Sequence, residues 1–263
     1  MKKHDVTSKG VSRQKNADIA ADTMQLLKKH EIRFREESEN SVLFTENDLC
    51  QPIAPDRAVF DTVIEVTSET TLAAMSRFGD SPFILNFASA KNPGGGFLKG
   101  SSAQEESLAR SSSLFYHLNR FKKPFYEFNK AFPGVYSHRI IFSPAVTFLK
   151  NDRGKLLDKE VHCAVVTCPA VNAGVAKVSA EEVRALMEER MIRILRCCAE
   201  RNAKVLILGA FGCGVFKNDP ENIASIWHRL LFGEEFKGVF QHVVFACYGP
   251  KENFDAFKIK FQK

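Results

Sequence analysis

The chain is organised around the segment Asn86-Phe-Ala-Ser-Ala-Lys-Asn92-Pro-Gly94-Gly95-Gly96-Phe-Leu-Lys-Gly-Ser-Ser-Ala-Gln104-Glu105-Glu106. An apolar run at residues 83–85 predicts a buried strand that leads into it. Three successive glycines lack a Cβ, so the turn lets the backbone approach a ligand closely. Ser102 and Glu105 have the Ser-x-x-Glu spacing of a capping box, which predicts Gln104, Glu105 and Glu106 in the first turn of a helix. The segment therefore predicts carboxylates held on a helix beside a glycine-lined cavity.

A second glycine-rich segment follows the apolar run at residues 204–208 and reads Gly209-Ala-Phe-Gly212-Cys213-Gly214-Val215-Phe216. Such a loop places unpaired backbone N–H groups at the carboxyl edge of a sheet, where they bind anions such as phosphate. It has no Lys-Ser/Thr after the glycines and no Gly-x-Gly-x-x-Gly spacing, so it is neither a Walker A loop nor a dinucleotide fingerprint. From this loop alone, an ordinary tight turn is the alternative interpretation.

Together the two motifs resemble those of the poly(ADP-ribose) glycohydrolases, a catalytic branch of the macrodomain superfamily, and especially its compact microbial members. Three glycines followed closely by Gln-Glu-Glu resemble the family signature, and the second motif resembles its diphosphate-holding loop. The similarity runs from about Val42 to the C-terminus and includes residues 141–144 and 167–174. The resemblance implies a three-layer α/β/α macrodomain-like fold with a mixed central sheet.

The apolar pattern independently predicts an α/β fold, because buried strands alternate with helices. Strands are expected at residues 41–44, 59–67, 83–85, 139–142, 161–167, 204–208 and 242–247, and helices at 16–37, 70–78, 104–118, 180–200, 253–261 and from 220 onward. We expect the strand at 59–67, the helix at 70–78 and the strand at 83–85 to form a βαβ unit. We also expect Pro144 to end the strand at 139–142. The predicted organisation is an N-terminal helical extension at residues 1–40 and a macrodomain-like catalytic domain at residues 41–263.

Composition places the chain among soluble globular proteins, since 44% of its 263 residues are hydrophobic and 26% are charged. The apolar runs are too short to span a bilayer, and the basic N-terminus lacks the apolar core of a signal peptide, so we expect a cytoplasmic location. Seven cysteines without a Cys-x-x-Cys pair argue against a disulfide framework or a zinc cluster. A net charge of +6 favours a polyanionic partner, although many unrelated proteins share it. We expect a monomer that binds no membrane and no specific nucleic-acid sequence.

The resemblance implies substrate contacts from both motifs. They are Asn86, Ser89, Asn92, Gly94, Gly95, Gly96 and Gln104 around the first turn, and Ala210, Phe211, Gly212, Cys213, Gly214, Val215 and Phe216 in the second loop. Phe216 is expected beside the adenosine or the proximal ribose, with core packing as the alternative. Ser89 departs from the Asp or Asn that relatives often carry there. Cys213 has no candidate base nearby in sequence, so its small size explains it better than nucleophilicity does.

The adjacent glutamates are expected to have different roles, because neighbouring helical residues diverge by about 100° and therefore do not flank one bond as paired glycosidase carboxylates do. The resemblance assigns proton transfer to Glu106, binding of ribose hydroxyls to Glu105, and support of the site to Gln104. The acid would protonate the leaving 2′-oxygen of a ribose–ribose bond and then accept a proton from water. That acid needs a raised pKa, which partial burial and the neighbouring carboxylate favour. Neither a metal nor a cofactor is required.

The expected substrate is poly(ADP-ribose) or an ADP-ribosylated protein, trimmed from the chain end, with ADP-ribose as the product ligand. Two alternatives remain open. One is an ADP-ribose-binding reader without turnover, against which the intact Gln104-Glu105-Glu106 argues. The other is a hydrolase for a single ADP-ribose attached to protein or nucleic acid, which the sequence does not separate from a polymer hydrolase.

Overall fold

The computed structural model describes residues 4–57, 59–80 and 82–262. Its helices are α1 (His4–Lys29), α2 (Glu31–Glu39), α3 (Thr71–Ser76), α4 (Gln104–Ala109), α5 (Leu114–Asn119), α6 (Ala180–Glu200), α7 (Pro220–Phe232) and α8 (Lys251–Phe261), with short 3-10 turns η1 (Pro55–Arg57) and η2 (Phe97–Lys99) and a π-helix η3 (Lys122–Glu127). Its strands are β1 (Val42–Phe44), β2 (Val63–Thr67), β3 (Pro82–Phe87), β4 (Ile140–Lys150), β5 (Leu156–Cys168), β6 (Val205–Leu208) and β7 (His242–Ala246). None of the helices in these described ranges is both long and apolar enough to cross a bilayer.

The strands form one seven-stranded sheet in the order β1-β4-β5-β3-β6-β7-β2. β5, β3, β6, β7 and β2 are parallel neighbours, whereas β4 is antiparallel to both β5 and β1. The predicted mixed sheet is therefore confirmed. β2, α3 and β3 are connected as expected, but β6 and β7 lie between the two strands, so this βαβ unit does not join neighbours.

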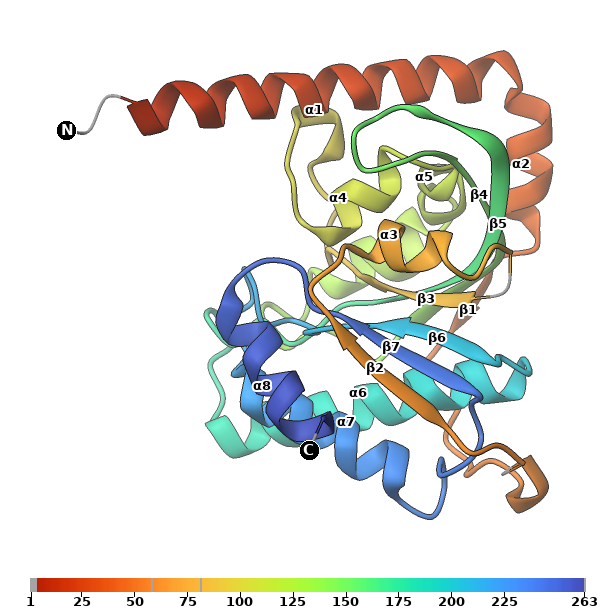
Figure 1. Ribbon diagram of the computed structural model, residues 1–263, viewed down its shortest axis with the longest axis vertical. Coiled ribbons are helices and arrows are strands. Elements are labelled where there is room, and N and C mark those ends of the chain that lie inside the picture. The colour runs from red at the N-terminus through yellow and green to blue at the C-terminus, as the bar shows by residue number, and fades with distance from the viewer. Residues whose placement is uncertain (1–3, 58, 81, 263) are drawn as a thin grey trace.

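Helices cover both faces of the sheet, with α6, α7 and α8 on one side and α3, α4 and α5 on the other (Figure 1). Each face has its own core; its buried side chains include Met191, Trp227 and Phe257 on the first side and Met75, Leu108 and Leu118 on the second. Burying each such side chain contributes about 1.5–3 kcal/mol. The three-layer α/β/α architecture predicted from the sequence is confirmed.

The N-terminal helix predicted at residues 16–37 is two helices, α1 and α2, and the first already begins at His4. They meet at His30, whose φ of −123° and ψ of 36° are not helical. Ala20, Leu27 and Phe34 are buried, so both helices pack on the rest of the chain. Figure 1 shows α1 lying across the molecule above α4. The division of the chain near residue 40 remains a prediction.

Pro144 does not end its strand, contrary to the prediction. β4 continues through it to Lys150, and the pairing with β5 shifts register between Ser143 and Val146. β1 pairs only with residues 140–142, so the backbone at Pro144 has no ladder partner to lose on that side. Proline is tolerated in a strand at such an irregularity.

The helix predicted over residues 104–118 is also wrong, because α4 ends at Ala109 and α5 starts at Leu114. Between them, Ser112 forms an isolated bridge with Phe148, and the N–H of Ser113 donates to the carbonyl of Thr147 at 2.9 Å. The edge of β4 thus takes the backbone hydrogen bonds that would have continued the helix.

Candidate active site

A cleft of about 910 Å³ opens at the carboxyl ends of the parallel strands. Phe87 at the end of β3, Ala210 after β6 and Ala246 at the end of β7 all line it. Ligands bind at this edge in open α/β sheets because the strand ends leave backbone groups unpaired there. The two glycine-rich motifs, more than a hundred positions apart in sequence, line this one cleft.

Most of the predicted site residues line the cleft. They are Ser89, Asn92, Gly95, Gly96, Gln104, Glu105, Glu106, Ala210, Gly212, Gly214, Val215 and Phe216. Four predicted contacts are not among the lining residues, namely Asn86, Gly94, Phe211 and Cys213. Both Asn86 and Phe211 are fully buried and contact residues that line the cleft: Nδ2 of Asn86 donates to Glu105, and the Phe211 ring packs against Phe87. A direct role for these four in binding remains a prediction.

The glycines of the first turn are required by close contacts. Gly95 has a φ of +59°, and a Cβ added there would lie 2.4 Å from Oε1 of Glu106 and 3.2 Å from Oε2 of Glu105. At Gly94, with a φ of +69°, a Cβ would meet the Phe97 ring at 3.0 Å. Any side chain at Gly95 would displace a carboxylate, so this glycine keeps the space between the turn and the acids open.

Gln104 fixes the start of α4 to the end of β3. Its Oε1 accepts from the N–H of Phe87 at 2.9 Å, and its Nε2 donates to the carbonyl of Leu85 at 2.8 Å and to Oγ1 of Thr71 at 3.2 Å. The side-chain amide therefore takes the place of a neighbouring strand for two backbone groups. The support role predicted for Gln104 fits these contacts.

Glu105 points into the protein and is only 2% exposed. The N–H of Ser89 donates to its Oε2 at 2.7 Å, and Nδ2 of Asn86 donates to its Oε1 at 3.3 Å. Burial, followed by the charge of Glu106, raises the pKa of Glu105 to about 8, even though these hydrogen bonds favour the ionised form. The free site therefore keeps a proton on this carboxyl group near neutral pH.

Glu106 is half-buried and takes a different hydrogen bond. The N–H of Gly96 donates to its Oε1 at 3.0 Å, and no described residue donates to its Oε2. The side chain lies on the lining of the cleft. One oxygen is thus anchored to the glycine turn while the other is available to a ligand.

The first turn of α4 holds all three residues of the Gln-Glu-Glu motif, as predicted, but not through a capping box. The N-cap residue is Ala103, and no side chain caps the helix. Ser102 is exposed, and the carboxylate of Glu105 bonds to Ser89 instead of the N-cap backbone. The contacts with β3 and the glycine turn replace the cap.

The second glycine loop forms another wall of the cleft. Gly212 has a φ of +77°, and a Cβ there would lie 2.6 Å from both the Ala170 Cβ and Nδ2 of Asn218. Asn218 secures the loop by donating from Nδ2 to the carbonyls of Val171 at 2.7 Å and Gly212 at 3.1 Å. Burial raises the pKa of the Cys213 thiol, which agrees with a small space-filling residue.

Two aromatic rings meet beside this loop. Phe216 and Tyr136 have ring centroids 5.9 Å apart, and both line the cleft. The buried guanidinium of Arg190 in α6 donates to the carbonyls of Tyr136 at 3.3 Å, Val135 at 3.0 Å and Pro169 at 2.8 Å. An arginine of α6 therefore holds the strip of chain that presents Tyr136.

Sequence reasoning missed part of the lining, including Ser12, Tyr136, Asp152, Tyr248 and Asn253. Ser12 comes from α1, Tyr136 from the segment between η3 and β4, Asp152 from the turn between β4 and β5, and the other two from the chain around α8. The glycine and proline at residues 249–250 directly after a strand were the available signal, because they follow β7 where it ends at the same sheet edge. The carbonyl of Asn172 accepts from the N–H groups of Val175 and Ala176 in a turn, and Ser179 caps α6.

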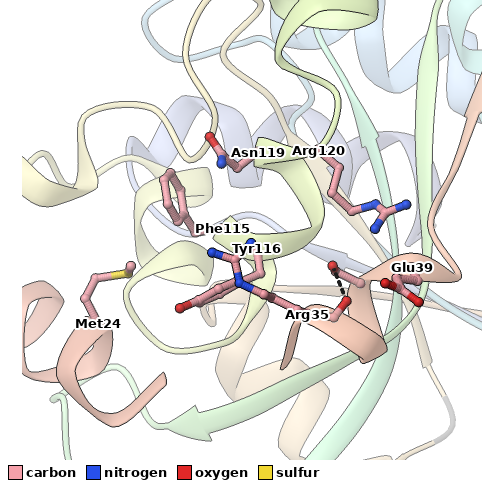
Figure 2. A pocket seen from close by; sticks show the side chains of 8 residues that line it. Met24, Arg35, Glu39, Phe115, Tyr116, Asn119 and Arg120 are labelled. Carbon is pink, nitrogen blue, oxygen red and sulfur yellow. Dashed lines mark hydrogen bonds between the residues drawn. The ribbon is translucent and has the colours of Figure 1, made fainter. Parts of the chain in front are cut away.

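A second hollow, of about 380 Å³, lies between α1, α2 and α5 (Figure 2). Met24, Arg35, Tyr116 and Arg120 line it, and the Arg35 guanidinium is 5.8 Å from the centroid of the Tyr116 ring. None of the described residues of the two glycine motifs lines this hollow. The chemistry expected from the sequence therefore belongs to the larger cleft. Within the described ranges, no three His, Cys, Asp or Glu side chains group as metal ligands.

Known proteins resemble this chain over most of its length. The family described as "Microbial-type PARG, catalytic domain" matches residues 12–151. Poly(ADP-ribose) glycohydrolase from Thermomonospora curvata, solved with the inhibitor ADP-HPD, is 35% identical with a TM-score of 0.86, covering 94% of this chain and 100% of that chain. The enzyme from Deinococcus radiodurans, solved in complex with ADP-ribose, is 36% identical with a TM-score of 0.77, covering 87% and 96%. No curated protein matches. The family match begins within α1, ahead of the start near Val42 that the sequence predicted.

Proposed function

The chain belongs to the microbial-type poly(ADP-ribose) glycohydrolase family and is a glycosidase of poly(ADP-ribose), and we propose that Glu106 carries the proton transfer. The observation that carries this proposal is the position of the Glu106 carboxylate. Its Oε1 is held by the N–H of Gly96 at 3.0 Å on the lining of the cleft. A carboxyl group anchored by one oxygen presents the other in a defined direction, which proton transfer requires.

In the proposed reaction, Glu106 protonates the 2′-oxygen of the leaving ribose while an oxocarbenium-like centre forms at C1″ of the terminal ADP-ribose. Water then attacks C1″, and Glu106 accepts the proton that this water releases. Glu105, buried beside the strand end, binds ribose hydroxyls.

The second loop and the aromatic pair hold the remainder of ADP-ribose in this proposal. Ala210, Gly212, Gly214 and Val215 line a wall suited to a diphosphate, because a glycine loop presents N–H groups without side chains in the way. Phe216 and Tyr136 offer faces to the adenosine or the proximal ribose. The Deinococcus relative solved with ADP-ribose supports ADP-ribose as the ligand.

We further expect a cytoplasmic monomer that trims poly(ADP-ribose), free or on protein, from the chain end. The net charge of +6 supports a polyanionic substrate. An ADP-ribose reader and a hydrolase for single ADP-ribose units are the alternatives, and both use the same cleft.

The deciding experiment measures ADP-ribose release from poly(ADP-ribose) by the wild-type protein and by Glu106→Ala. The expected result is a loss of turnover by about three orders of magnitude or more, with the Kd for ADP-ribose within about tenfold of the wild type. Glu181→Ala is the matched control, because Glu181 lies in the first turn of another helix, α6, and is exposed. It should retain full turnover.

Near-normal turnover by Glu106→Ala would reject the assigned role. A wild-type protein that binds ADP-ribose yet leaves the polymer intact at enzyme excess would be a reader. Release from a singly modified protein, with none from polymer, would identify the mono-ADP-ribose hydrolase. The products of a defined polymer separate end trimming, which yields ADP-ribose from the start, from internal cleavage, which first yields shorter chains.

A further inference from the structure

Helix α1 packs on η2, directly after the three glycines, and meets the end of α4 through a small apolar core (Figure 1). Ala20 of α1, Phe97 of η2 and Ala109 of α4 form a small core of their own, apart from the two main cores, with Met24 and Phe115 at its edge. This core joins α1 to the two segments that flank the carboxylates.

At one end of this contact, α1 touches the turn that follows the three glycines. Nε of Arg13 donates to the carbonyl of Lys99 at 3.0 Å, and Nδ2 of Asn16 donates to the carbonyl of Gly100 at 3.5 Å. A Cβ at Gly100, whose φ is +76°, would lie only 1.9 Å from the carbonyl oxygen of Arg13. The backbones of α1 and the turn are therefore so close here that residue 100 has no room for a side chain.

At the other end, α1 holds Arg110, the C-cap residue directly after α4. The fully buried Thr23 shares its one Oγ1 proton between two carbonyl oxygens, that of Arg110 at 2.6 Å and that of Ile19 at 2.9 Å. Arg110 in turn donates from its guanidinium to the carbonyl of Ser101 at 3.0 Å and to Oγ of Ser107 at 2.7 Å. The two contacts of α1 thus lie on either side of Glu106.

Backbone hydrogen bonds connect the two ends through Glu106. The N–H of Ser101 donates to the carbonyl of Gly96 at 3.2 Å, and the N–H of Gly96 donates to Oε1 of Glu106 at 3.0 Å. The N–H of Arg110 donates to the carbonyl of Glu106 at 3.1 Å. These contacts form a closed ring. It runs from α1 to the turn, from the turn to Glu106, along α4 to Arg110, and back to α1 through Thr23.

We propose that α1 positions the catalytic carboxylate, with Arg13 and Thr23 as positioning residues that hold Glu106 against Gly96. This inference rests on the role proposed above for Glu106. The matched family region also begins at residue 12, one position before the first of these contacts. A displacement of about 1 Å at a reacting group can cost about 100-fold in rate, so loosening α1 acts on turnover without removing any group that touches substrate.

The first test is Thr23→Val, which removes the hydroxyl at nearly constant volume. We expect kcat on poly(ADP-ribose) to fall about 10-fold or more, while the Kd for ADP-ribose changes by less than about threefold. Thr62→Val is the matched control, since Oγ1 of Thr62 donates to the carbonyl of Phe240 at 2.7 Å, on a part of the chain that does not line the cleft. Both variants should melt at lower temperature, but only Thr23→Val should lose kcat when assayed well below its Tm.

The second test is Gly100→Ala, which pushes α1 away from the turn. Gly79→Ala is its control, because Gly79 has a similar φ of +63° and no described atom within 4 Å of an added Cβ. We expect lower kcat with retained ADP-ribose affinity for Gly100→Ala alone. Unchanged kcat in both Thr23→Val and Gly100→Ala, or equal losses in the controls, would overturn the inference. Glu106→Ala, measured in the same assay, separates the two proposals. If Glu106→Ala is inactive, unchanged kcat in Thr23→Val and Gly100→Ala rejects only the role of α1. If Glu106→Ala is active, the role proposed for Glu106 fails.

Discussion

The backbone N–H of Ser89 donates a 2.7 Å hydrogen bond to Oε2 of Glu105, joining the residue just past β3 to the first turn of α4. Together with the two bonds of Gln104 to β3, it makes the strand end and the helix start one rigid unit. The cost of burying the carboxyl group is lowered because it keeps its proton, and that proton makes the stability of the fold depend on pH.

Replacing Glu105 by Gln should change how stability varies with pH. Folding raises the pKa of Glu105 from 4.5 to about 8. Between these values the folded state binds more protons than the unfolded state, so this group's stabilising effect, complete below pH 4.5, is lost as the pH rises toward 8. The slope is at most about 1.4 kcal/mol per pH unit.

Glu105→Gln cannot titrate, so its free energy of unfolding relative to the wild type should increase through this window. Denaturant titrations of both proteins at several pH values measure the difference. A constant difference between the two proteins across the window would show that Glu105 is ionised in the fold.

Gly95→Ala should inactivate the protein without preventing ADP-ribose from binding. The added methyl group would lie 2.4 Å from Oε1 and 2.8 Å from Cδ of Glu106, so the carboxylate must move. We expect kcat to fall about 100-fold, together with a stability loss of about 1–2 kcal/mol from the left-handed backbone. Gly79→Ala, at a matching φ, should show the stability loss alone. If Gly95→Ala keeps its kcat, turnover does not depend on the observed position of the Glu106 carboxylate.

Arg190→Met should weaken ADP-ribose binding from a distance. Arg190 is fully buried and donates to the carbonyls of Pro169, Val135 and Tyr136, which methionine would leave unpaired. Each unpaired buried group costs about 1–3 kcal/mol, and the strip that presents Tyr136 should loosen. Thermal melting and the Kd for ADP-ribose measure both effects. Arg184→Met, on an exposed position of the same helix, should change neither.

Phe216→Ala should lower affinity for ADP-ribose more than it lowers kcat. The ring lines the cleft and packs beside Tyr136, and stacking on a base is worth about 1–3 kcal/mol. Calorimetric titration with ADP-ribose and with ADP tests the contact, since both ligands carry the adenosine. Phe232→Ala, at an exposed ring on α7, serves as the comparison. An unchanged Kd would assign Phe216 to packing, the alternative that its sequence position allowed.

Local sequence predicted the features that depend on near neighbours. The strands before both glycine motifs, the helix boundaries at residues 180–200 and the start of α7 at Pro220 were predicted correctly, because apolar periodicity and helix-start signals act within a few residues. Pro144 and the break after Ala109 were not, because in both cases the neighbouring strand decides which backbone groups are paired.

By itself, the sequence determined the alternation of strands and helices, the two glycine turns and the place of Gln104-Glu105-Glu106 at a helix start. Only the tertiary structure decided that Glu105 is buried with a raised pKa, that Glu106 is anchored to Gly96, and that α1 contacts the chain on either side of them at Lys99 and Arg110. The physical reason is that desolvation and close contact depend on groups brought together from distant parts of the chain. Spacing along the sequence carries no record of those distances.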